Sequence, residues 1–562
     1  MNEQTPLIRT RLSIAYFLQF AIWGSWAVFL GGFVGGKLHF TASQNAWLYS
    51  VIPLGAIISP LFIGPIADKY FSAQKVMALL HLIGGGCLVG AYYTQDFTVL
   101  LTLMFIYGIC YMPTIALINS VVFKHIPNPD NAPRVFLFGT IGWIVINVAI
   151  SAHFGGMEEP TFFMIGGGAA ILLAILSLTL PDTPPKGAEA GGGSAFGLDA
   201  LTLFKDKTFS IFVICAFLAS IPACGFFFAV QGQVLGERGF PYPGGLGTLC
   251  QIAEIAFMAA LPFFVSRFGL KKVLLIGMSA WAVRYLFFMS PNLGMVIIAL
   301  LLHGFCYSFL YVGSYMYGDK KAPEHMKASV QSLLTFLLLG VGMFLGSQLA
   351  GVMGDMNPAA ITTMEVASAD DPVGLPAWED PTVADSKIKF LNPVVAYKSL
   401  LGVVGLGGEE AAATEEDDTI GDMSAFAKEG TTSVSIADID QEIVAGDITY
   451  TPEEIKSIFT DVATFTKTEL KPGDEGFDDA AAKLAGDDLT LTRENWLNAQ
   501  VKGWKNIFLY PSIFIFVILA IFLVLGKDPV DEEEAPADDA PADDDAAEEA
   551  PAEEAAADDA GE

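Results

Sequence analysis

The chain has 562 residues, 53% of them hydrophobic and only 16% charged, with a formal net charge of −31. This is far fewer charged residues than the roughly 25% of a soluble domain, and the long apolar runs of residues 12–354 exclude a soluble enzyme. Residues 355–503 and 527–562 hold most of the acidic side chains and the rest is mildly basic without a basic patch, so we expect no nucleic-acid binding.

Twelve stretches are long and apolar enough to cross a bilayer, which takes about 20 residues as a helix. The first is interrupted by polar residues such as Gln19 and lacks a small-residue cleavage site, so it is not expected to be a signal peptide. The twelve predicted spans lie near residues 12–35, 45–67, 74–94, 97–123, 134–154, 160–181, 208–235, 246–266, 271–291, 293–318, 326–354 and 504–526.

The loops between these spans differ in their content of lysine and arginine. If the N-terminus is inside, the short outer loops hold only Lys37 and Arg238, whereas the inner segments hold sixteen lysines and arginines. Lysine and arginine favour the cytoplasmic side. The pattern therefore predicts a multi-pass protein of the cytoplasmic (inner) membrane with both termini in the cytoplasm.

Residues 182–207 are rich in Pro and Gly and predict a cytoplasmic linker between two halves. A weak repeat supports this division, because residues 64–70 and 262–268 occupy the same place in each half and each is followed by lysine. Two repeats related by an axis along the membrane normal are the architecture of major facilitator transporters. The expected fold is thus an all-α integral membrane protein of twelve helices in two six-helix halves.

The predicted division of the chain follows from these boundaries. It has an N-terminal half (residues 1–181), the linker (182–207) and spans 7–11 (208–354). These are followed by an acidic extracytoplasmic insert (355–503), span 12 (504–526) and a cytoplasmic tail (527–562). The tail consists almost only of Ala, Asp, Glu and Pro and is expected to be disordered. The insert is expected to be a small, partly ordered domain, serving either as solvated surface or as a binding region for a partner or cation.

One acidic residue, Glu254, lies well inside a predicted span, and Gln251 precedes it by one helical turn on the same face. Ionisable groups in spans are costly and usually functional. A buried carboxyl group that binds and releases a proton near neutral pH is what proton-coupled transport requires. The alternative is a structural ion pair between Glu254 and Arg284 of span 9.

Other polar and aromatic residues within the spans are weaker signals, because such side chains often only join neighbouring helices. Thr140 and Gln231 are candidates for contact with a substrate, and His81 and His303 either relay protons or pack between helices. Asp68 and Lys69 end span 2 and are expected to latch helices between conformations. The six cysteines all lie in apolar stretches, so neither a disulfide framework nor a metal site is expected, and no cofactor is implied.

Seven segments in order over about residues 10–350 resemble the nucleoside:proton symporter family of the major facilitator superfamily. They are Phe17–Phe20 with Trp23–Trp26, Ala67–Lys69, Tyr111–Thr114 with Leu117–Asn119, Gly139–Gly142, Leu180–Pro181, Gly197–Ala200 with Leu203–Lys205, and Gln251–Glu254 with Leu261–Phe264.

The resemblance implies proton-driven uptake of nucleosides by alternating access, in a monomer within the lipid bilayer. It also implies that Thr140, Gln251 and Glu254 contact the nucleoside, with Glu254 as the proton-coupling residue. An amide offers a donor and an acceptor to a base edge, and a carboxylate accepts hydrogen bonds from ribose hydroxyls.

The chain departs from the family at three positions. Phe136 stands where the family has an arginine, Ser308 where it has an aspartate, and the family's asparagine late in span 7 falls near Gln231. We keep these positions as candidate substrate contacts. The departures leave three possibilities: coupling rests on Glu254 alone, the substrate is another small polar solute, or coupling is absent. A transport-inactive receptor that works through its insert is a further alternative.

Overall fold

The computed structural model describes residues 4–38, 40–126, 132–157, 159–184, 197–237, 242–290, 292–356 and 490–529. It also describes five short strands and residues 393–394 and 396–398 within the insert. The remainder of the predicted insert, residues 185–196 of the predicted linker and the tail from residue 530 lie outside this part.

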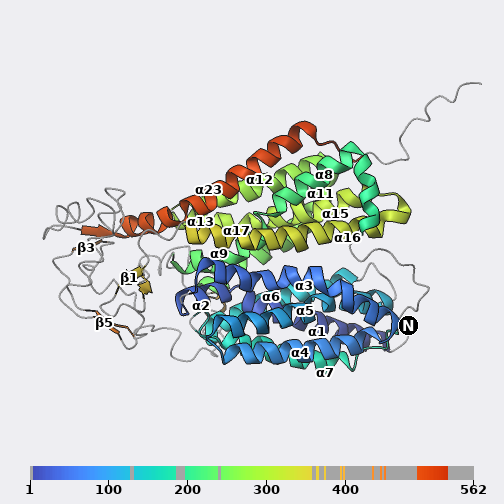
Figure 1. Cartoon of the computed structure of the whole chain (residues 1–562), viewed down its shortest axis with the longest axis horizontal. Coiled ribbons are helices and arrows are strands. Elements are labelled where there is room, and N and C mark those ends of the chain that lie inside the picture. The colour runs from blue at the N-terminus through green and yellow to red at the C-terminus, as the bar shows by residue number, and fades with distance from the viewer. Residues whose placement is uncertain are drawn as a thin grey trace, which may run out of the picture.

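The helices of the membrane region form two groups that lie side by side in Figure 1. The first group comprises α1 (Gln4–Ala27), α2 (Leu30–Gly36), α3 (Ala42–Lys69), α4 (Ala73–Tyr92), α5 (Phe97–His125), α6 (Ala132–His153) and α7 (Thr161–Ser177).

The second group has more interruptions. It comprises η2 (Leu198–Lys205), α8 (Lys207–Ser220), α9 (Cys224–Glu237), α10 (Pro243–Leu246), α11 (Leu249–Phe268), α12 (Leu270–Phe288), α13 (Leu293–Leu301), α14 (His303–Tyr307), η3 (Ser308–Val312), α15 (Gly313–Lys321), η4 (Glu324–Met326), α16 (Lys327–Thr335), η5 (Phe336–Gly342), α17 (Met343–Met356) and α23 (Arg493–Leu525).

Ten helical stretches of the described residues are long and apolar enough to cross a membrane. Each coincides with a predicted span to within a few residues, so ten of the twelve predicted spans are confirmed as long apolar helices. The other two predicted spans correspond to α7, with 17 residues, and α12, with 19.

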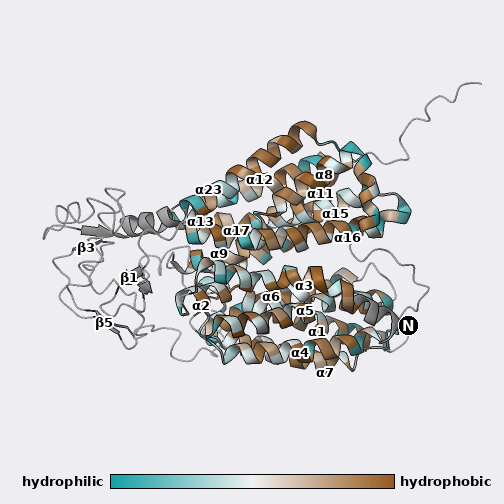
Figure 2. Cartoon of the chain, in the orientation of Figure 1, coloured by the Kyte–Doolittle hydropathy of each residue, from teal (hydrophilic) through white to brown (hydrophobic). Residues whose placement is uncertain are grey.

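Hydrophobic residues, in brown in Figure 2, lie along the middle of the helices. Large hydrophobic side chains are more than half exposed there, among them Leu172, Ile175, Val517 and Leu523. A surface of this extent would be costly in water. It suits the hydrocarbon core of a bilayer, where apolar side chains face lipid.

Several predicted spans are broken, which the hydropathy pattern did not reveal. Span 7 stops at Ser220 and resumes at Cys224, with Pro222 between them. Proline lacks the N–H that would continue the helical ladder, and the hydroxyl of Tyr285 donates to the carbonyls of both Pro222 and Ala223. Two π-helical turns, η3 and η5, interrupt the helices after α14 and α16. Such turns are frequently found at functional sites.

The described strands of the insert form three antiparallel pairs: β1 (Thr363–Glu365) with β2 (Pro372–Gly374), β3 (Ser433–Ser435) with β6 (Thr490–Thr492), and β4 (Ile443–Ala445) with β5 (Ile448–Tyr450). α23 begins directly after β6, at Arg493, whereas we expected the last span from residue 504. Hydropathy marks only the apolar part of a helix, so the polar first part of α23 was not predicted.

Residues 393–398 of the insert touch the ends of both helix groups. The ammonium of Lys398 donates to the hydroxyl of Tyr242, which precedes α10, over 2.7 Å. The hydroxyl of Tyr397 lies 3.3 Å from Nε2 of His153 at the end of α6. Val394 is fully buried. We call this end of the bundle the insert end, and the end where α1 begins the N-terminal end.

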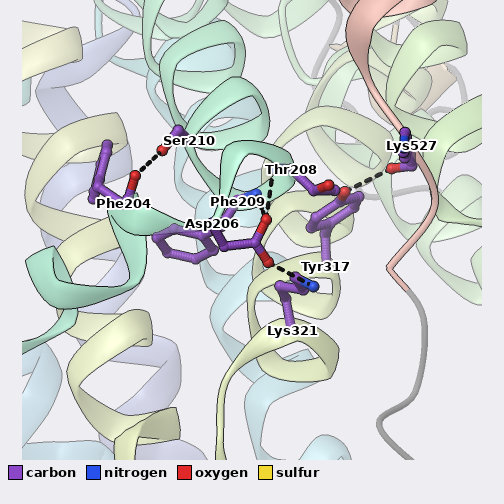
Figure 3. A network of polar contacts seen from close by, with 8 residues as sticks. All are labelled: Phe204, Asp206, Thr208, Phe209, Ser210, Tyr317, Lys321 and Lys527. Carbon is purple, nitrogen blue, oxygen red and sulfur yellow. Dashed lines mark hydrogen bonds and ion pairs between the residues drawn. The ribbon is translucent and has the colours of Figure 1, made fainter. Parts of the chain in front are cut away.

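A polar network at the N-terminal end joins η2, α8, α15 and the residues after α23 (Figure 3). The carboxylate of Asp206 accepts from the N–H of Thr208 over 2.7 Å, which caps α8, and pairs with the ammonium of Lys321 at 2.7 Å. The hydroxyl of Tyr317 donates to the carbonyl of Lys527 over 2.6 Å. These contacts join the start of α8 to the end of α15.

Replacing Asp206 should separate its two roles. An N-cap is worth about 1 kcal/mol and an exposed ion pair about 0.2–1 kcal/mol. Asp206→Ala should therefore lower the free energy of unfolding by about 1–2 kcal/mol, and Asp206→Asn, which keeps a capping oxygen, by less than 1 kcal/mol. Denaturation of the purified protein in detergent measures both. Equal losses in the two variants would show that the cap contributes nothing.

The ionisation of Asp206 should also make the stability of the protein depend on pH. Partial burial is the largest influence on the pKa of Asp206 and raises it, but the Lys321 ammonium and the N–H groups of Thr208 and Phe209 together lower it below its usual 3.8. A lowered pKa stabilises the fold above the unfolded value, and the contribution is lost as pH falls through the folded value. The stability difference between the wild type and Asp206→Ala should therefore shrink once the pH falls below about 4.

Candidate functional site

A cavity of about 1240 Å³ lies between the two helix groups. Its lining runs from Gln251 and Glu254 in the middle of the bundle to Lys124, in the last turn of α5, and to Thr183 and Pro184 after α7. Sites that enclose a small ligand usually measure about 300–1,000 Å³. The larger volume fits a vestibule that extends from a central site to the N-terminal end.

At the insert end the two groups are held together by polar contacts. The amide of Asn45 in α3 donates to the carbonyl of Ala229 in α9 over 2.8 Å. The amide of Gln348 in α17 donates to the hydroxyl of Ser50 in α3, also over 2.8 Å. The hydroxyl of Ser43 donates to the carboxylate of Asp355. The bundle is thus closed by direct contacts at the end opposite the vestibule.

α11 carries the polar side chains of the central site. It follows the turn at Gly247 and ends before Gly269, whose φ of +79° favours glycine. Gln251 and Glu254 are three residues apart, so they share a helix face, and both line the cavity. The side-chain oxygen of Gln251 is buried without a hydrogen-bond partner.

α6 brings Thr140 to the opposite wall. Gly142 of α6 packs so tightly against α1 that a methyl group on it would lie 2.2 Å from the carbonyl oxygen of Phe17. A larger residue would force the two helices apart. Thr140 lines the cavity, so α6 and α11 place polar side chains from the two helix groups on one space.

Three aromatic rings from α1, α6 and α9 meet beside these polar groups. Trp23 lies edge-on to Trp143 with ring centroids 5.6 Å apart, and Phe228 lies 6.4 Å from Trp23 and 6.3 Å from Trp143. All three line the cavity. Nε1 of Trp143 is buried without a hydrogen-bond partner. The site thus combines flat apolar surfaces with a donor, on Trp143, and an acceptor, on Gln251, that have no hydrogen-bond partner.

Glu254 does not pair directly with Arg284. Within the described residues, the basic side chain within 4.0 Å of its carboxylate is His303, whose Nε2 lies 3.8 Å from Oε2 of Glu254. Arg284 is fully buried and donates to Nδ1 of the same imidazole over 2.7 Å. Its guanidinium also lies 3.5 Å from the centre of the Phe227 ring. The direct ion pair that the sequence suggested as an alternative is therefore replaced by an imidazole bridge.

The other candidate residues lie away from the cavity lining. Phe136 packs its ring against Tyr16 at 4.9 Å. Ser308 is fully buried as the first residue of the π-helical turn η3, with no partner for its hydroxyl. Gln231 is buried beside Gly247. The side chains of Asp68 and Lys69 fall outside the described part of the chain, so the latch remains a prediction.

Sequence reasoning missed Trp143 and Phe228. Trp143 follows Thr140 by three residues, so the helical period alone would have placed the two on one face. Phe228 had no such signal, because it reaches the site from α9, after the break in span 7. In the described residues no cluster of three or more His, Cys, Asp or Glu side chains has the arrangement of a metal site.

Comparisons with known proteins agree on one family. The profile described as nucleoside H+ symporter matches residues 7–364, which leaves nearly all of the insert and the tail outside the match. YegT of Escherichia coli (strain K12) is 40% identical over 357 residues, 61% of this chain and 84% of that protein. Xanthosine permease of the same organism is 33% identical over 369 residues, 62% of this chain and 88% of that protein.

Solved structures agree with this family. A crystal structure of the nucleoside transporter NupG is 27% identical, covers 62% of this chain and 92% of that chain, and superposes with a TM-score of 0.59. With a family match over more than half of its length, the chain belongs to the nucleoside H+ symporter family.

Proposed function

We propose that this protein takes up nucleosides across the membrane together with protons, by alternating access, and that it is a transporter and not an enzyme. The observation that carries the proposal is the central site. There, the carboxyl group of Glu254 lines a cavity together with Gln251 and Trp143, whose amide oxygen and indole N–H have no hydrogen-bond partner, in a member of the nucleoside H+ symporter family.

The chemistry of the site suits a nucleoside. The oxygen of Gln251 accepts from an amino or imino group of a base, and Nε1 of Trp143 donates to a base carbonyl or ring nitrogen. Glu254 is positioned for ribose hydroxyls, with Thr140 on the opposite wall. The rings of Trp23 and Phe228 offer stacking surfaces, where aromatic pairs gain about 0.5–1.5 kcal/mol beyond burial.

We infer that α7 and α12 also cross the membrane, which completes two six-helix halves with the boundaries predicted from the sequence. The lysine and arginine asymmetry then places the N-terminal end in the cytoplasm and the insert outside. In that orientation the vestibule opens to the cytoplasm, and the contacts of Asn45, Ser50 and Asp355 close the outer end. This arrangement is the inward-facing state of a transporter, which we take to act as a monomer in the inner membrane.

The departures at Phe136 and Ser308 are compatible with this function. Neither residue lines the cavity, and Phe136 forms part of an aromatic contact with Tyr16. With Ser308 in place of an aspartate, Glu254 is the single acidic residue among the described residues of the lining. We propose that proton coupling passes through this one carboxyl group, with Asp68 and Lys69 as a conformational latch.

The function is tested by uptake of labelled uridine and adenosine into transporter-deficient cells, with and without a protonophore. We expect saturable uptake of at least one nucleoside, at least fivefold above cells with an empty vector, that collapses when the protonophore removes the gradient. Uptake that persists with the protonophore would contradict proton coupling. Normal surface expression without uptake would contradict the nucleoside as substrate and favour another small polar solute.

A further inference from the structure

The imidazole between Arg284 and Glu254 is held in one tautomer. A guanidinium has only donors, so Nδ1 of His303, 2.7 Å from NH1 of Arg284, must be an unprotonated acceptor. A neutral imidazole with an unprotonated Nδ1 carries its proton on Nε2. That N–H faces Oε2 of Glu254, 3.8 Å away.

Tight packing of α14 on α11 brings the two side chains together. A methyl group on Gly304 would lie 2.4 Å from the carbonyl oxygen of Ala253, so glycine allows this close approach. His303 precedes Gly304 and is buried, whereas Glu254 follows Ala253 with about a fifth of its side chain exposed to the cavity. Glu254 therefore has two neighbours, the imidazole on one side and the cavity on the other.

We propose that His303 is a positioning residue that couples protonation of Glu254 to substrate binding. The proposal rests on the proposed function and deepens it. When Glu254 is ionised, its carboxylate accepts a hydrogen bond from Nε2–H, closes the 3.8 Å gap and is held away from the substrate. When Glu254 is protonated, it loses the charge that makes its bond to Nε2–H strong, and the carboxyl group turns its O–H toward the cavity.

The proton in this step comes from water in the cavity. A hydronium ion transfers its proton to one carboxylate oxygen and becomes water, and the imidazole stays neutral throughout because Arg284 keeps Nδ1 as an acceptor. The carboxyl O–H then donates to an acceptor on the nucleoside. Release into the cytoplasm reverses both events: the nucleoside leaves, the proton returns to water, and the carboxylate rebinds Nε2–H.

Other titratable groups near the pair are neutral thiols and phenols on the surrounding elements. Arg284 of α12 is the one buried cation among the described residues around the pair, and Lys124 lies at the far end of the cavity lining. The remaining groups are Cys224 of α9, Cys250 of α11, Tyr285 of α12, Cys306 and Tyr307 of α14, and Tyr311 of η3. The proposed coupling between protonation and substrate binding thus involves Arg284, His303 and Glu254.

The test measures the dissociation constant of uridine, or of the nucleoside taken up best, for purified protein from pH 5 to 9. If only the protonated form binds well, the constant rises tenfold per pH unit above a midpoint. His303→Leu removes the donor that stabilises the carboxylate, so its midpoint should rise by about one pH unit, a tenfold higher proton affinity. His303→Gln supplies an oxygen for Arg284 and an N–H for Glu254, so it should keep the wild-type midpoint.

Cys250→Ala is the matched control. It removes the Arg284 contact to Sγ at 3.4 Å and leaves the imidazole in place, so its midpoint should stay that of the wild type. A His303→Leu midpoint equal to the wild type would overturn the proposal while leaving the transport function intact. Wild-type protein that binds no nucleoside at any pH would instead overturn the proposed function.

A second measurement does not depend on the folding of a leucine variant. Nitrogen NMR of histidine-labelled wild-type protein, with His303 assigned by loss of its signal in His303→Gln, reports the tautomer directly. We expect an Nε2–H imidazole from pH 5.5 to 8. An imidazolium or an Nδ1–H tautomer in that range would overturn the proposal.

Discussion

Glu254→Gln should abolish accumulation of uridine against a gradient, lowering initial proton-driven uptake at least tenfold. Glu254 is the single acidic residue among the described residues of the cavity lining, so its loss leaves no carboxyl group among them to carry a proton. Glutamine resembles the protonated side chain in shape and in its ability to donate. Nucleoside binding by purified Glu254→Gln should therefore persist and become independent of pH between 5 and 9.

The matched control is Glu324→Gln, the same substitution at an exposed residue that pairs with Lys327 at 2.7 Å. We expect it to leave uptake and its sensitivity to a protonophore unchanged. Proton-driven accumulation that survives in Glu254→Gln would show that the coupling group lies elsewhere. Loss of nucleoside binding in the same variant would contradict the expectation that the uncharged side chain suffices to bind the nucleoside.

Trp143→Phe should weaken nucleoside binding about tenfold. The substitution keeps an aromatic ring beside Trp23 and Phe228 and removes only the indole N–H and part of the ring surface. That N–H is buried without a hydrogen-bond partner, so a substrate acceptor that pairs with it gains a hydrogen bond of about 0.5–1.5 kcal/mol and removes the cost of an unsatisfied donor. Equilibrium binding of uridine and adenosine measures the loss.

Trp47→Phe provides the comparison, because Trp47 is 41% exposed on α3 and makes a ring contact to Phe344 outside the cavity. Its binding constant should match the wild type. An unchanged constant in Trp143→Phe would show that the indole N–H does not meet the substrate. A loss for only one of the two nucleosides would show which base offers the acceptor.

The identity of the central carboxyl group could be inferred from local pattern alone. Glu254 stands out because a charge inside an apolar run is costly, and Gln251 shares its face by the helical period. The same argument could have predicted Trp143, because it follows Thr140 by three residues and so shares its helix face. The role of His303 could not be predicted in this way, because it depends on contact with Arg284, which is 19 residues away along the chain and on another helix.

The sequence by itself determined where ten long apolar helices lie, and it predicted their orientation, since apolar length and loop charge are local properties of a segment. Only the tertiary structure decided where the helices break, at Pro222 and at the turns η3 and η5, and which polar atoms stay unpaired at Gln251 and Trp143. It also decided that Arg284 reaches Glu254 through an imidazole. The physical reason is that contacts between helices depend on close packing, such as that at Gly304, and no one-dimensional pattern specifies which buried side chains will meet.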